Sequence, residues 1–195
     1  PIDEAGNPTD KFYAIRDLLE NYLQEGETLP EIPQNSVKTI TIPAISFGVT
    51  ANVFDNLPVA KQSEKIQPME NFDQGWGSIL YRKTIPACNH SQQLVLKELH
   101  DWATVYINGK AIGSFDRRKG ENSIEIPALK TTARLDILVE GMGRVNYGEA
   151  IIDRKGITEK VTLDGNEQSN WTVYNLPVDY GFQTKARFVQ KPANG

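Results

Sequence analysis

The residue types with the clearest chemical potential lie in one glycine-rich stretch, "GMGRVNYG", at residues 141–148. It places Arg144, Asn146 and Tyr147 close together. Proteins bind sugars with an aromatic face for stacking and with polar groups that orient the hydroxyls, so these residues suit a saccharide contact. In the alternative interpretation, Arg144 forms an ion pair with a neighbour and the loop only closes the fold. The residue types alone leave both interpretations open.

Trp76 is a second candidate for a stacking contact. It stands between Gly75 and Gly77, which have no side chains to shield its ring, and an unshielded indole is a suitable platform for a ligand. Alternatively, Trp76 packs under a loop and the glycines form a bulge at the start of a strand. Trp102 and Trp171 occur within strand patterns and are predicted to belong to the core.

Other catalytic signatures are absent from the sequence. It contains no GxSxG motif, no phosphate-binding glycine loop and no metal-ligand spacing, so no catalytic residue, metal or cofactor is predicted. Cys88 is the single cysteine, which excludes an internal disulfide, and we expect a buried small side chain rather than a nucleophile. His90 and His100 stand in polar contexts and are expected at the surface. Aspartates and glutamates on the strands are expected to be solvated.

Composition narrows the class of partner. The 195 residues have a formal net charge of -4, which argues against nucleic acid or an anionic membrane as a partner. No run of about 18 apolar residues is present, so no membrane-spanning helix is predicted. The chain begins with Pro1 and shows no signal peptide, and we expect it to be a piece of a longer polypeptide.

The first 36 residues differ in pattern from the rest. Residues 1–27 include an amphipathic helix of about four turns, which Asn7 or Thr9 can cap and after which Gly26 can form a left-handed C-cap. Its apolar face needs a partner to cover it. Residues 28–36, "TLPEIPQNS", contain two prolines and are predicted to be a linker. The apolar face consists of Phe12, Ile15, Leu18, Leu19, Tyr22 and Leu23.

From residue 37 to 176 the apolar period changes to two, which predicts strands. Asn108-Gly109 is the strongest hairpin signal, and Lys119-Gly120 and Asp164-Gly165 are weaker ones. Many short strands with frequent turns predict a mainly β fold, an antiparallel β-sandwich of the jelly-roll type. Residues 177–195 show no clear pattern. The predicted strands are 37–43, 77–86, 92–99, 102–109, 111–116, 122–127, 134–140, 156–165 and 169–176.

Three motifs resemble the non-catalytic β-domain of glycoside hydrolase family 35 β-galactosidases: "GWGSILYRKTI", "DWATVYINGKAIGSFDRR" and "LDILVEGMGRVNYGEAIIDRKGI". The resemblance runs from about Asp73 to Leu176 in the same order. The family pattern more often has Asn where Gly141 stands. It implies a galactose-binding-domain-like jelly roll over residues 37–176. It also implies that residues 1–27 are the last loop and helix of a catalytic TIM barrel, and that residues 177–195 connect to a further β-domain.

The resemblance further implies an activity for the parent enzyme. The family hydrolyses terminal β-linked galactose with retention, using two glutamates on barrel strands. Neither glutamate can be placed in this chain, which should be inactive alone. The implied partners are the barrel of the same polypeptide and a β-galactoside oligosaccharide, with Arg144, Asn146 and Tyr147 on the aglycone side. Trp76 stays a substrate-binding candidate from its glycine neighbours alone. The substrate class favours an extracytoplasmic compartment. Two alternatives remain: a free-standing carbohydrate-binding module, and a structural spacer without sugar contact.

Overall fold

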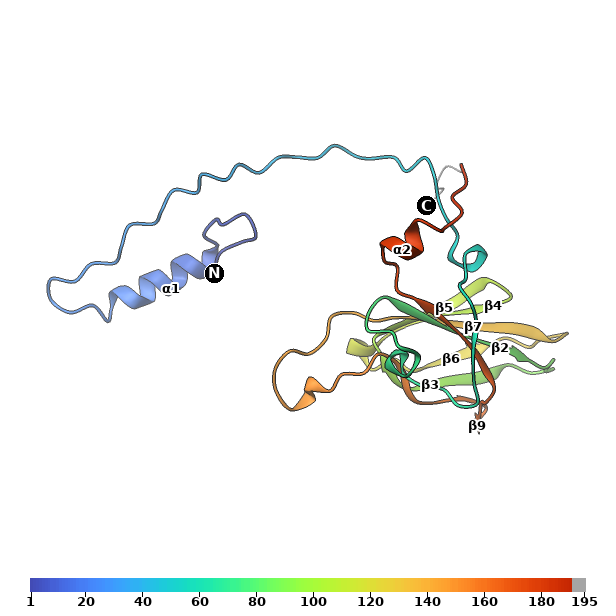
Figure 1. Ribbon diagram of the computed structural model, residues 1–195. Coiled ribbons are helices and arrows are strands. Elements are labelled where there is room, and N and C mark those ends of the chain that lie inside the picture. The colour runs from blue at the N-terminus through green and yellow to red at the C-terminus, as the bar shows by residue number, and fades with distance from the viewer. Residues whose placement is uncertain (191–195) are drawn as a thin grey trace. The chain divides into compact units, whose positions relative to one another are not determined.

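The computed structural model describes residues 1–190, which divide into two units, Pro1–Phe47 and a second that begins at Gly48 (Figure 1). In the first unit, helix α1 covers Asp10–Glu20. Thr9 is its N-cap and has an extended backbone. Asp10 lies in the first turn, where a carboxylate interacts favourably with the helix dipole. The predicted helix is confirmed, but it is shorter than expected, because it ends at Asn21 rather than at Gly26.

No residue of α1 is buried. Phe12, Ile15 and Leu19 line a shallow apolar groove together with Leu29 and Pro30 of the same unit. The proline-containing segment lies beside the apolar face of α1 without burying it, and Ile15, Leu18, Leu19 and Tyr22 all stay exposed. Among residues 1–190, no helix has the length and apolar character needed to cross a membrane.

The strand predicted for residues 37–43 is not formed. The segment has no strand hydrogen bonds, and its apolar side chains, among them Ile40 and Ile42, are 83% and 68% exposed. Alternating apolar residues make a strand only if a neighbouring strand accepts their backbone hydrogen bonds. The described residues of the first unit supply no such strand. The predicted strand at 37–43 is therefore wrong.

The second unit consists of two antiparallel sheets, which confirms the predicted mainly β fold. The six-stranded sheet has the order β1-β10-β2-β7-β4-β5 and the four-stranded sheet the order β6-β3-β8-β9. The strands are β1 Lys61–Ser63, β2 Ser78–Ile85, β3 Gln92–His100, β4 Trp102–Ile107, β5 Lys110–Asp116, β6 Ser123–Ile126, β7 Ala133–Glu140, β8 Gly156–Leu163, β9 Asn166–Glu167 and β10 Trp171–Leu176.

Short helical turns lie before β1, between the strands and after β10. They are η1 Val53–Asp55, η2 Met69–Phe72, η3 Arg117–Lys119, η4 Glu149–Ile151 and α2 Tyr180–Gln183. The Asn108-Gly109 hairpin between β4 and β5 is confirmed, with both residues at positive φ. Gly120 does not form a hairpin turn and instead ends η3 in a left-handed conformation.

One hydrophobic core lies between the two sheets. Its side chains follow the period of two, as in β7, where Leu135, Ile137 and Val139 are fully buried. Trp171 is also fully buried, and its ring meets that of Tyr81 edge to face at 6.4 Å between centroids. The loops at the ends of β7 and β2 are held on this core, and they hold the candidate site.

Candidate functional site

The glycine-rich stretch forms the start of a long loop between β7 and β8. We call Gly141–Arg144 the loop root and residues 145–152 the loop tip. The Gly141 amide donates to the Gly77 carbonyl at 3.0 Å, which extends the pairing of β7 with β2 by one step. The loop therefore begins on the sheet itself rather than in an independent turn.

Buried charged side chains hold the next two residues of the loop root. The amide of Met142 donates to Oδ2 of Asp101 at 2.9 Å. The carbonyl oxygen of Gly143 accepts from Nζ of Lys155 at 3.0 Å. A backbone amide and a backbone carbonyl of the loop root are thus both bound to ionic groups, which form stronger hydrogen bonds than neutral partners.

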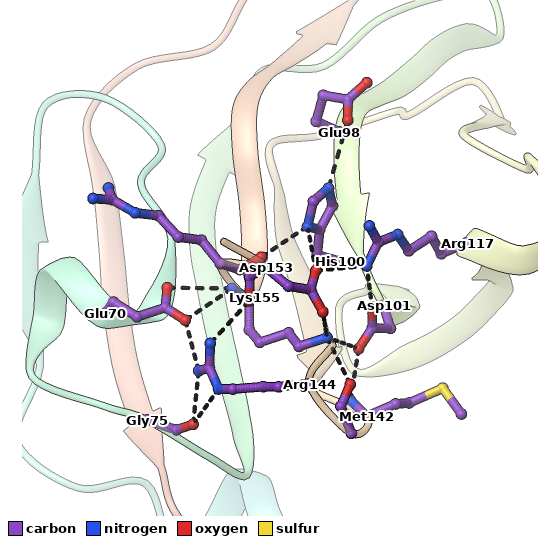
Figure 2. A network of polar contacts seen from close by, with 12 residues as sticks. Glu70, Gly75, Glu98, His100, Asp101, Arg117, Met142, Arg144, Asp153 and Lys155 are labelled. Carbon is purple, nitrogen blue, oxygen red and sulfur yellow. Dashed lines mark hydrogen bonds and ion pairs between the residues drawn. The ribbon is translucent and has the colours of Figure 1, made fainter. Parts of the chain in front are cut away.

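These groups belong to an ion cluster, in which the buried Asp101, Asp153 and Lys155 meet Arg117, whose side chain is 39% exposed (Figure 2). Lys155 Nζ lies 2.6 Å from Asp101 and 2.7 Å from Asp153. Arg117 binds the same two carboxylates at 2.9 and 2.8 Å. The side chains of Lys155, Asp153 and Asp101 are only 2%, 3% and 9% exposed. Two cations compensate two carboxylates, which buried charges require.

The cluster changes the ionisation of its carboxylates. Burial opposes the charged form of Asp153, but hydrogen bonds from Lys155 and Arg117 outweigh it, and the pKa of Asp153 lies well below its usual range. For Asp101, burial is again opposed by hydrogen bonds from Lys155 and Arg117, and the pKa is lowered. Both groups are therefore anionic at neutral pH.

His100 lies at the edge of the cluster, and its expected surface position is wrong. Its side chain is only 14% exposed. Nδ1 lies 2.8 Å from the carbonyl oxygen of Arg154, and because a carbonyl only accepts, Nδ1 carries the proton in this contact. Nδ1 also lies 3.4 Å from Asp153, and Nε2 lies 3.5 Å from Glu98.

Arg144 ends the loop root with contacts to three parts of the chain. It donates to the carbonyls of Gly75 and Asp153 and pairs with Glu70 at 2.6 Å (Figure 2). The ion pair considered from the sequence is therefore present. These bonds use all three nitrogens of the guanidinium. The contacts fix the place of Arg144 in the loop root, and a contact with a sugar stays a prediction.

The loop tip is exposed and its hydrogen bonds are local. Tyr147 is 89% exposed, and Ile151 and Ile152 are exposed beside it. In the described part of the chain, the hydrogen bonds of the loop tip join it only to itself and to Asp153. Large apolar side chains grouped on a surface loop indicate a contact surface. The site thus has a firmly bound loop root and a loop tip that presents an aromatic side chain.

Trp76 lies beside the loop root rather than under a loop. It is 63% exposed, so the packed alternative does not occur. Trp76, Met142, Arg144 and Lys155 are among the residues that line a pocket of about 320 Å³. The structure therefore brings Trp76 and Arg144 together in one pocket, whereas Asn146 and Tyr147 lie on the loop tip and do not line it.

The remaining sequence candidates lie outside this site. Cys88 is half-buried rather than buried, and its sulfur lies 3.3 Å from Nδ1 of His90, which is exposed as expected. Trp171 is in the core as predicted, whereas Trp102 is half-buried. Among residues 1–190, no group of three or more His, Cys, Asp and Glu side chains is arranged to hold a metal ion.

The ion cluster was not predicted, although its members occur in the motifs that carry the family resemblance. Asp101 begins one motif and Arg117 is near its end, while Asp153 and Lys155 belong to "DRKGI". The available signal was a lysine and an aspartate two residues apart directly before a strand. Both side chains are buried where the chain enters β8.

Residues 67–177 match the family model described as "Beta-galactosidase, first all-beta domain". The chain belongs to this family. It is 37% identical over 178 residues to a beta-galactosidase of Xanthomonas manihotis, covering 91% of this chain and 29% of that relative. It is 35% identical to beta-galactosidase 1 of Dictyostelium discoideum over 203 aligned positions, with 91% and 30% covered. It is 32% identical to the human beta-galactosidase over 187 residues, with 92% and 27% covered.

The chain thus spans about three tenths of the length of these beta-galactosidases. The family match begins only at residue 67, whereas the alignments cover more than nine tenths of the chain. Most residues before the all-beta domain therefore also resemble beta-galactosidases.

Proposed function

We propose that this chain is the non-catalytic β-domain of a retaining β-galactosidase that hydrolyses terminal β-linked galactose. In this role it supports a catalytic TIM barrel of the same polypeptide, and the loop tip walls the aglycone side of the active site. The observation that supports this most is Tyr147, an exposed aromatic residue on a loop whose root is bound to buried charges.

The chemistry is divided between the two parts of such an enzyme. Retaining hydrolysis needs two carboxylates about 5 Å apart, one as acid/base and one as nucleophile, and these belong to the barrel. The loop tip contributes a ring face from Tyr147 and a polar amide from Asn146, which stack on and orient the leaving sugar. Such contacts act on binding and on aglycone preference rather than on bond cleavage.

Replacement of Tyr147 by alanine tests this proposal. In a β-galactosidase polypeptide that contains this chain, we expect Tyr147→Ala to raise KM by about three- to tenfold, with kcat changed less, because a stacking contact is lost. Tyr147→Phe should keep the stacking and the wild-type KM. Steady-state kinetics with β-galactosides of several aglycones measure this.

A matched control is Tyr180→Ala, because Tyr180 is 82% exposed on α2, outside the loop. It should leave KM unchanged. Unchanged kinetics of Tyr147→Ala across all aglycones would exclude a contact between the loop tip and the substrate.

A free-standing carbohydrate-binding module is the second candidate, and the exposed Trp76 beside a pocket favours it. The two candidates differ in the affinity of the chain alone. If the β-domain supplies only part of a cleft, lactose should bind with a Kd of about 1 mM or weaker. Titration of the chain, with Trp76→Ala as the control, measures this. Binding far tighter than 1 mM that Trp76→Ala abolishes would favour the module.

A further inference from the structure

We propose that Lys155 is the positioning residue of the β7–β8 loop: from within the core it sets the place of the loop root, and through it the place of Tyr147. This rests on the proposed function, because the position of the loop tip affects catalysis only if the loop tip faces the substrate. Lys155 itself is buried and touches no substrate in this proposal.

Lys155 uses all three of its ammonium hydrogens in hydrogen bonds. An ammonium has three N–H donors and no acceptor. Lys155 Nζ has three acceptors within hydrogen-bond distance: Asp101 at 2.6 Å, Asp153 at 2.7 Å and the Gly143 carbonyl at 3.0 Å. Two donors therefore fix the ammonium to carboxylates of the core, and the third binds the loop root.

Lys155 also contacts the loop root indirectly, through Asp101. Oδ2 of Asp101 accepts from Lys155 and also from the amide of Met142. The charge of Lys155 therefore holds in place the carboxylate that binds the preceding residue of the loop root. The Gly143 carbonyl binds this ammonium directly. The Met142 amide binds Asp101, a carboxylate that both Lys155 and Arg117 hold (Figure 2).

Loss of the Lys155 ammonium should affect the position of the loop root more than the stability of the two sheets. Arg117 binds both Asp101 and Asp153, so the two carboxylates keep a cation if Lys155 is replaced. The Gly143 carbonyl has no such second support, because among residues 1–190 it accepts only from Lys155. The Met142 amide keeps Asp101 as its acceptor, but Arg117 alone then holds that carboxylate. A methionine can fill the space of the lysine stem but cannot donate to the Gly143 carbonyl. Lys155→Met should therefore loosen the middle of the loop root, Met142 and Gly143, while Gly141 and Arg144 keep their own hydrogen bonds and the sheets stay packed.

Hydrogen exchange of the whole 195-residue chain tests the proposal. We expect the Met142 amide to exchange about tenfold faster or more in Lys155→Met, with amides of β3 and β8 changed much less, because the opening is local. Lys155→Arg, which keeps a cation with several donors, should restore much of the protection.

The matched control is Arg82→Met. Arg82 is also an ion-pair partner of a buried aspartate, Asp136, but it lies on the six-stranded sheet and makes no contact with the loop root. Arg82→Met should leave the exchange rate of the Met142 amide unchanged relative to the exchange rates of the sheet amides. Equal acceleration in Arg82→Met and Lys155→Met, or no acceleration in Lys155→Met, would overturn the proposal.

If Lys155→Met does not fold, the double variant Lys155→Met/Asp153→Asn serves instead, because it removes one charge of each sign and leaves Arg117 paired with Asp101. Faster exchange of Met142 is again the expected result, and unchanged exchange would overturn the proposal.

Kinetics in the longer β-galactosidase separate this inference from the proposed function. Lys155→Met should raise KM as Tyr147→Ala does, with a smaller effect on kcat, and Lys155→Arg should reverse the increase. If Tyr147→Ala raises KM and Lys155→Met does not, Lys155 is not the positioning residue. If exchange confirms the loosening of the loop root and neither variant changes KM, the proposed function fails and the anchoring stands.

Discussion

Replacement of Asp153 by alanine is expected to lower the free energy of unfolding by about 3 to 5 kcal/mol. Its carboxylate is 3% exposed and is bound by Lys155 and Arg117 at 2.7 and 2.8 Å. Without it, the buried ammonium of Lys155 shares the single carboxylate of Asp101 with Arg117, whose side chain is 39% exposed. An uncompensated buried charge is costly because the protein interior solvates it poorly.

Urea unfolding followed by tryptophan fluorescence measures this loss. The control is Glu149→Ala, which removes an exposed carboxylate from the same loop and should change the stability by less than about 0.5 kcal/mol. If Asp153→Ala cost no more than this control, the ion cluster would not be the compensated network described above.

The same carboxylates predict a pH dependence. The folded pKa values of Asp101 and Asp153 are lowered, mainly because hydrogen bonds from Lys155 and Arg117 outweigh the effect of burial. Their contribution to stability is therefore present above the unfolded pKa of about 3.9 and is lost as the pH falls below it. The stability difference between wild type and Asp153→Ala should be largest near pH 7 and shrink towards pH 3. A difference that grew on acidification would contradict this sign.

Gly156→Ala is expected to lower the stability by about 3 kcal/mol or more. Gly156 has a φ of +99°, where a side chain is strained, and a Cβ atom there would collide with the hydroxyl of Tyr81. That hydroxyl cannot move freely, since it donates to the Gln67 carbonyl at 2.7 Å and accepts from the Ile157 amide. The backbone strain at residue 156 and the steric overlap with Tyr81 should therefore both lower the stability.

Gly120→Ala is the matched control for backbone strain. Gly120 has a φ of +69°, but a Cβ atom there would meet nothing within 4 Å. It should cost only about 1 to 2 kcal/mol. The difference between the two variants in thermal unfolding measures the collision with Tyr81. Equal losses would mean that Tyr81 and its neighbours can adjust.

Strand patterns in the second unit could be predicted because burial is local to each strand. Leu135, Ile137 and Val139 alternate with outward residues, and this period needs no knowledge of the partner strand. The very short strands β1 and β9 were missed, because two or three residues show no period. The predicted strand at 37–43 failed for the opposite reason: its pattern is clear, but pairing depends on a neighbour that the sequence pattern cannot supply.

The ion cluster could not be predicted because its members meet only in the folded chain. Asp101 follows β3, and Arg117 lies 16 positions further along the chain, after β5. Lys155 precedes β8, 54 positions from Asp101. Taken alone, each of these residues is of a type that is usually exposed to solvent, because lysine and aspartate are rarely buried unless they are paired. These charged residues pair because the fold brings the ends of several strands together, and the sequence alone does not show which strand ends meet.

The exposure of Trp76 and Tyr147 agrees with the chemistry inferred from their neighbours. Glycines flank Trp76, and Asn146 and Gly148 flank Tyr147, so neither ring has an apolar side chain directly next to it in the sequence. The sequence could not place these two residues relative to each other. The structure puts Trp76 in the pocket beside the loop root and Tyr147 on the loop tip, so a ligand that meets one need not meet the other.

The central claim is that the loop tip touches the leaving sugar of a β-galactoside. The most direct measurement is a crystal structure of a polypeptide that joins this chain to a catalytic β-galactosidase domain, with a β-galactoside disaccharide bound. We expect the ring of Tyr147 to lie in van der Waals contact with the aglycone, within about 4 to 4.5 Å. A loop tip that points into solvent, with the sugar held by the catalytic domain alone, would contradict it.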